Sequence, residues 1–134
     1  MPLIPAEASG ALSEWLQSIR QEGIGTITCL ATPGELKRYL AVVGPDADLI
    51  SFYRSRRIVV HHHAVEDPAH ASPEARSGIL EQLEQLKPVV LDEYRQRVGA
   101  HLIHCSGGMD RAAPVAAFVA AKEATRHLRS ERGN

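Results

Sequence analysis

Apolar residues recur at helical spacing near the start of the chain. Leu12, Trp15, Leu16 and Ile19 would share one face of a helix, and Gly23 marks its end. Trp15 is therefore predicted to be a core residue rather than a platform for a ligand. The same periodicity predicts further helices over residues 35–39, 48–56, 73–87, 89–98 and 112–128.

Several of these helices carry their own start and stop signals. Asp46 or Asp48 could cap the helix that runs to about residue 56, and Ser72 followed by Pro73 is a favourable helix start. Pro88 should break or kink the long apolar-periodic segment into two pieces, because proline lacks the backbone N–H that a helix interior uses.

Three short runs of β-branched and apolar residues predict strands over residues 25–30, 58–63 and 100–104. Because helices and strands alternate, residues 1–134 are expected to form one α/β domain, a compact parallel-type sheet flanked by helices. Ligands bind beyond the carboxyl ends of the strands in such sheets. The segments that follow the second and third strands should therefore form the functional site.

Composition narrows the class of protein. The chain has 134 residues, 44% of them hydrophobic, and a formal charge of −1, which gives no basic field for nucleic acid. No apolar run is long enough for stable membrane insertion, and no leader peptide is expected because no basic segment followed by an apolar one is found at the start. Cys29 and Cys105 are too few for a disulfide framework, so a reduced, cytoplasmic setting is expected and Cys29 is expected to pack in the interior.

Three consecutive histidines invite a metal proposal. On a strand, His61 and His63 point to one face and His62 to the other. No cysteine or carboxylate completes an evident tetrahedral set, so a structural role is favoured and no metal is expected.

The most informative stretch runs from His104 to Arg111 and has the pattern H-C-x-x-G-x-x-R, with five residues between Cys105 and Arg111. A strand precedes this glycine loop and an alanine-rich helix follows it. Loop N–H groups and the positive end of the helix dipole would cradle a phosphate and favour a cysteine thiolate. The predicted phosphate-binding residues are Ser106, Gly107, Gly108, Met109, Asp110 and Arg111.

Each remaining side chain of the loop has an expected part in the chemistry. Cys105 is the candidate nucleophile, and Arg111 offers a planar fork for two phosphate oxygens. His104 is expected to orient the loop by hydrogen bonding. Cleaving a phosphate ester also requires a proton for the departing oxygen, and Asp67, on the loop after the second strand, is the candidate general acid; a solvated surface aspartate is the alternative.

The Cys105 loop resembles the signature of cysteine-dependent phosphatases of the protein-tyrosine and dual-specificity superfamily. The segments 34–39, 61–67, 72–73, 102–105 and 115–117 resemble the cyclin-dependent kinase-associated dual-specificity phosphatases, so that the resemblance covers roughly residues 11 to 121. It implies the compact dual-specificity phosphatase fold, with Cys105 as nucleophile, Arg111 as phosphate clamp and Asp67 as general acid.

The chain departs from this pattern in three respects. Ala112 stands where such phosphatases commonly have Ser or Thr after the arginine, which would slow hydrolysis of the phosphoenzyme. Asp110 resembles the in-loop aspartate of myotubularins and certain bacterial tyrosine phosphatases, and it is the alternative acid; it could also serve as a structural tie. The usual C-terminal helices are expected to be lacking, so a partner copy could cover the exposed core in a homodimer.

These features predict a metal-independent cysteine phosphatase without cofactors. It would act on phosphotyrosine, phosphoserine or phosphothreonine in proteins, or on a small phosphomonoester, through a cysteinyl-phosphate intermediate. A phosphoinositide phosphatase and a phosphate-binding pseudophosphatase without turnover are the alternatives. A rhodanese-type sulfurtransferase is disfavoured because its loop is typically one residue shorter.

Overall fold

The computed structural model describes residues 8–39, 48–106 and 110–132. A three-stranded parallel sheet in the order β2-β1-β3 lies at its centre, which confirms the expected α/β architecture. The elements in chain order are α1 (Ala8–Gln21), β1 (Ile24–Cys29), α2 (Pro33–Leu36), η2 (Lys37–Tyr39), α4 (Leu49–Ser55), β2 (Val59–His62), η3 (Pro68–His70), α5 (Pro73–Arg95), β3 (Ala100–His104) and α6 (Ala112–Arg132).

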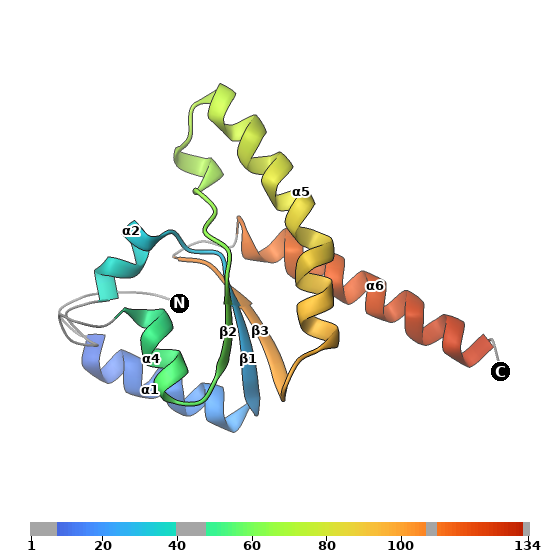
Figure 1. Ribbon diagram of the computed structural model, residues 1–134, viewed down its shortest axis with the longest axis horizontal. Coiled ribbons are helices and arrows are strands. Elements are labelled where there is room, and N and C mark those ends of the chain that lie inside the picture. The colour runs from blue at the N-terminus through green and yellow to red at the C-terminus, as the bar shows by residue number, and fades with distance from the viewer. Residues whose placement is uncertain (1–7, 40–47, 107–109, 133–134) are drawn as a thin grey trace.

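The helices form two layers, one on each side of the sheet (Figure 1). Helices α1 and α4 lie on one side, and α5 and α6 lie on the other. Each layer has its own buried cluster, one built around Ile27 and Tyr53 and the other around Leu30 and Val115. Alternation along the strands supplies both clusters, because successive side chains point to opposite faces.

The strand register aligns the carboxyl ends of all three strands at one end of the sheet. Cys29, the last residue of β1, is opposite His62 in β2 and His104 in β3. The chain therefore leaves β2 and β3 at the same end of the sheet, on either side of β1, as parallel pairing requires. This places Cys105 and the segment that contains Asp67 at the same end of the sheet.

Helix α5 corrects one expectation. It runs without interruption from Pro73 to Arg95, with Pro88 inside it, so the two predicted pieces are one helix. The ring of Pro88 is exposed, which lets water reach the carbonyl that proline leaves without a partner. The buried side chains Leu83 and Val90 lie on either side, and each contributes roughly 1.5–3 kcal/mol, which offsets the cost of the proline.

Other local predictions are confirmed. Asp48 caps α4 by accepting a hydrogen bond from the Ser51 N–H at 2.7 Å, and Ser72 caps α5. Asp46 lies outside the described residues. Cys29 is fully buried and Trp15 packs against the core. The segment after β2, expected to be loop, contains one short 3-10 turn.

Candidate active site

The candidate nucleophile lies directly after the last residue of β3. Cys105 is buried, with 4% of its surface exposed, and Arg111 comes just before α6 and is 1% exposed. Strand β3 therefore precedes the glycine loop and helix α6 follows it, as the sequence indicated. Gly107, Gly108 and Met109 lie outside the described residues, so their predicted phosphate contacts are not described.

The guanidinium of Arg111 is held by protein groups. Nη1 donates to Glu35 Oε1 at 2.6 Å and to the Val65 carbonyl at 2.7 Å. Nη2 donates to Glu35 Oε2 at 2.8 Å and to the Ser106 carbonyl at 3.3 Å. Both Nη nitrogens have then used their two hydrogens in hydrogen bonds to protein groups.

Glu35, which binds Arg111 and lines the cavity described below, is a residue of the candidate site that sequence reasoning missed. Thr32 and Glu35 form a capping box at the start of α2, in which Thr32 accepts from the Glu35 N–H and Glu35 accepts from the Thr32 N–H. The hydrogen bonds from Arg111 hold the pKa of Glu35 at about 2, below its ordinary 4.5. The spacing Thr-x-x-Glu was the available signal for the cap, but it could not reveal the partner 76 residues away.

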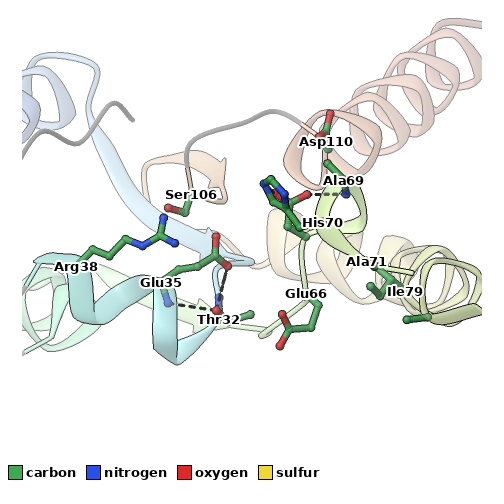
Figure 2. A pocket seen from close by; sticks show the side chains of 12 residues that line it. Thr32, Glu35, Arg38, Glu66, Ala69, His70, Ala71, Ile79, Ser106 and Asp110 are labelled. Carbon is green, nitrogen blue, oxygen red and sulfur yellow. Dashed lines mark hydrogen bonds and ion pairs between the residues drawn. The ribbon is translucent and has the colours of Figure 1, made fainter. Parts of the chain in front are cut away.

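Thr32 and Glu35 also line a cavity of about 670 Å³ (Figure 2). The figure shows Arg38 reaching toward Glu35 and Ser106 from one side, with His70 and Asp110 on the other side. The cavity brings together residues from four parts of the chain, and its lining consists of Thr32, Glu35, Arg38, Glu66, Asp67, Ala69, His70, Ala71, Ala75, Ile79, Ser106 and Asp110.

Both candidate acids line this cavity. Asp67 caps the short turn η3: its Oδ1 accepts from the Ala69 N–H at 2.9 Å, and its Oδ2 lies 3.7 Å from His70 Nε2. Its side chain is 25% exposed. Asp110 is exposed and directly precedes Arg111. Two carboxyl groups can therefore approach a bound ester, and Asp67 is the one held by a local hydrogen bond to its own turn.

The environment of Cys29, the second cysteine, differs from the one that a nucleophilic cysteine needs. Cys29 is fully buried in the cluster beneath α1 and α4. Burial raises the pKa of its thiol to about 11, so it is protonated at neutral pH. Cys29 is thus suited to packing, and the structure forms no disulfide between the two cysteines.

The histidine run belongs to a separate polar cluster. His63 Nε2 lies 2.5 Å and His61 Nδ1 3.7 Å from Oε2 of Glu93, a buried residue of α5, while His62 reaches the Ala31 carbonyl on the other side. Burial by itself would raise the pKa of Glu93, but hydrogen bonds from His63 and Thr28 outweigh it and lower the value. Over residues 8–39, 48–106 and 110–132, no group of three possible ligands could hold a metal ion.

Helices in the described part of the chain are all too short or too polar to cross a bilayer. A family model described as cyclin-dependent kinase inhibitor 3 matches residues 11–124 of the chain. Over 101 residues, the chain is 31% identical to cyclin-dependent kinase inhibitor 3 of Homo sapiens and 30% identical to that of Sus scrofa.

Each alignment covers 75% of this chain and 42% of the relative, so the chain spans less than half the length of the curated relatives it matches. No solved structure was found to match it.

Proposed function

Because the chain belongs to the cyclin-dependent kinase inhibitor 3 family, we propose that it is a cysteine phosphatase acting on phosphotyrosine, phosphoserine or phosphothreonine in proteins. The observation that supports this proposal is that Ser106, Asp67 and Asp110 line one cavity, and that Ser106 directly follows Cys105 in the chain, just beyond the carboxyl end of β3. A reducing compartment such as the cytoplasm would suit a thiolate enzyme.

The proposed reaction has two steps. In the first, the Cys105 thiolate attacks phosphorus, an S–P bond forms, and the ester P–O bond breaks. Asp67 gives its proton to the departing oxygen, which leaves as an alcohol or phenol. In the second, water attacks the cysteinyl phosphate, gives a proton to the Asp67 carboxylate, and releases inorganic phosphate and the thiolate. No metal or cofactor takes part in either step.

Charge neutralisation of the phosphate would come from three sources. The N–H groups between Ser106 and Arg111 and the N-terminus of α6 supply fixed partial charges. Arg111 would supply its guanidinium once the incoming dianion displaces Glu35 from the two Nη groups. Arg38, which also lines the cavity, adds a second guanidinium near Ser106.

A second candidate function is capture of phosphorylated partners without turnover. Two observations favour it: Ala112 is 3% exposed and brings no hydroxyl to help the thiolate leave, and Glu35 occupies the Nη groups of Arg111. A binding protein needs neither a leaving thiolate nor a general acid. Substrate binding without product release distinguishes it from the enzyme.

The test is hydrolysis of p-nitrophenyl phosphate in the presence of chelator and reductant, with Cys105→Ser as the matched variant. Turnover that survives the chelator and is lost in Cys105→Ser supports the thiolate mechanism. Inorganic phosphate binding without turnover in the wild type supports the binding protein. Equal turnover in both proteins would refute a role for Cys105.

A further inference from the structure

Arginines gather at the end of the sheet that lies opposite the cavity. Each of the helices α1, α4 and α5 ends where the next strand begins, so their carboxyl ends lie together at the amino end of the parallel sheet (Figure 1). The connections that follow them enter neighbouring strands, which lie about 5 Å apart. Five exposed arginines at these helix ends form what we call the basic surface: Arg20, Arg54, Arg56, Arg57 and Arg97.

The positive charge of the basic surface is not neutralised by its neighbours. The stretches 20–23, 54–58 and 95–99 contain six arginines and one glutamate, a formal charge of +5 in a chain whose total is −1. The sixth arginine, Arg95, pairs with Glu123 at 3.1 Å. Within the residues that the structure describes, none of the five arginines of the basic surface forms an ion pair with a carboxylate. This end of the sheet therefore attracts anions.

Two of these guanidiniums are held in place by aromatic rings. The guanidinium of Arg56 lies 4.7 Å from the centroid of the Phe52 ring. The guanidinium of Arg97 lies 4.1 Å from the centroid of the Tyr94 ring, and its Nη1 donates to the Tyr94 carbonyl at 3.0 Å. A guanidinium that stacks through its face keeps N–H groups at its edge, where a carboxylate binds through two parallel hydrogen bonds.

Arg57 has a backbone conformation that favours glycine. Its φ is 64°, and the connections after α1 and α5 use Gly23 and Gly99 for φ values of 69° and 66°. A residue with a side chain is strained there, whereas glycine is not. The partial negative charge of a helix end accounts for Arg20 and Arg54 in the last turns of α1 and α4. It does not account for a strained arginine beyond the helix, and such strain is typical of functional positions.

We propose that the basic surface docks an extended acidic segment of another protein. Alternate side chains of an extended segment point the same way about 6.6 Å apart, and the three connections span roughly 10 Å, so successive carboxylates would meet different arginines. Val59 and Val98, next to these connections, are 43% and 62% exposed and would contact apolar side chains of the segment. Anionic lipid is the other source of negative charge, but a lipid surface attracts any cation and does not require guanidiniums oriented on rings.

The inference goes beyond the proposed function and does not depend on it, because the cavity lies at the carboxyl end of the sheet. The test measures binding of a fluorescein-labelled peptide of about ten residues, alternating glutamate and valine, by fluorescence anisotropy. The peptide should bind wild type, and added salt should weaken binding because the charges are exposed. The same peptide with glutamine for glutamate should bind at least about tenfold more weakly. Arg56→Gln and Arg97→Gln should each weaken binding about three- to fivefold.

Arg57→Gly separates binding from folding. It removes the strain at a positive φ, so it should raise the melting temperature by roughly 2–4 °C while weakening peptide binding about three- to fivefold. Arg129→Gln is the matched control, because it removes the same charge from an exposed residue near the far end of α6 and should leave affinity unchanged. Turnover of p-nitrophenyl phosphate should be the same in all of these variants, so failure of the peptide to bind leaves the proposed function standing.

Three results would overturn the inference. Equal affinity of Arg57→Gly and wild type would remove the role of the strained arginine. An equal loss in Arg129→Gln would mean that only the net charge of the protein attracts the peptide. Binding of wild type to equimolar phosphatidylserine–phosphatidylcholine vesicles, without binding of the peptide, would assign the basic surface to a membrane instead.

Discussion

Arg111 and Glu35 are 76 residues apart in the chain and meet through two parallel hydrogen bonds of 2.6 and 2.8 Å. Arg111 is 1% exposed and Glu35 15%, so the pair is largely shielded from water. It joins the start of α2 to the start of α6 across the end of the sheet. The same contact that holds the guanidinium in place competes with any dianion that approaches it.

Replacing Glu35 with glutamine should destabilise the fold. The change leaves Arg111 buried without a countercharge, and removing one partner of such a pair costs about 3 kcal/mol of unfolding free energy. Urea denaturation measures this loss. Glu66→Gln removes the same charge from an exposed side chain of the same cavity and should change stability by less than about 0.5 kcal/mol. Equal effects from the two variants would contradict a stabilising role for the pair.

The stability contributed by Glu35 should depend on pH. Its pKa is about 2 in the folded protein and 4.5 ordinarily, so the unfolded chain takes up the proton first as pH falls. The contribution is therefore fully present above about pH 4.5 and disappears between pH 4.5 and 2. The difference in unfolding free energy between wild type and Glu35→Gln should shrink over that window. A difference that is constant down to pH 2 would show that the carboxylate charge is not the source.

The two candidate acids can be separated by leaving-group dependence. Asp67→Asn should reduce kcat about 100-fold on phenyl phosphate, whose leaving group needs protonation, and much less on p-nitrophenyl phosphate. Asp110→Asn carries the same chemical change in the same cavity and should affect the two substrates equally. The reverse pattern in steady-state kinetics would assign the proton transfer to Asp110.

The two cysteines should differ in reactivity. Because burial raises the pKa of Cys29 to about 11, iodoacetamide at pH 7 should leave that thiol unmodified in the folded protein. Cys105 should be alkylated with loss of turnover, and inorganic phosphate should slow the modification. Peptide mass mapping measures both sites, and denatured protein provides the fully modified reference. Alkylation of Cys29 before Cys105 would argue against the proposed nucleophile.

Two glycines should respond oppositely to alanine. A Cβ at Gly25 would overlap the carbonyl oxygen of Val98, so Gly25→Ala should lower the unfolding free energy by about 2 kcal/mol. A Cβ at Gly78, inside α5, meets nothing within 4 Å, and Gly78→Ala should stabilise by about 0.5–1 kcal/mol. Thermal or urea denaturation tests both changes. Destabilisation by Gly78→Ala would mean that a Cβ at this position meets a neighbouring atom, contrary to the structure.

The sequence by itself determined the order of the elements, the parallel sheet and the position of the glycine loop between β3 and α6. These follow from local rules: the spacing of apolar residues, helix caps such as Asp48 and Ser72, and the length of chain between strands. The exception was Pro88, which was expected to break or kink the helix. The burial of Leu83 and Val90 on either side of it outweighs the unfavourable effect of proline inside a helix. The matched family agrees with the resemblance that the loop carried.

Only the tertiary structure decided what the side chains of the site contact. That Arg111 binds Glu35, that His61 and His63 converge on Glu93, and that Trp15 reaches His104 through Tyr53 all depend on packing between elements far apart in the chain. A buried charge or donor must find a partner, but residue spacing does not say which one it finds. The packing of the elements in the folded protein determines which partner each buried group contacts.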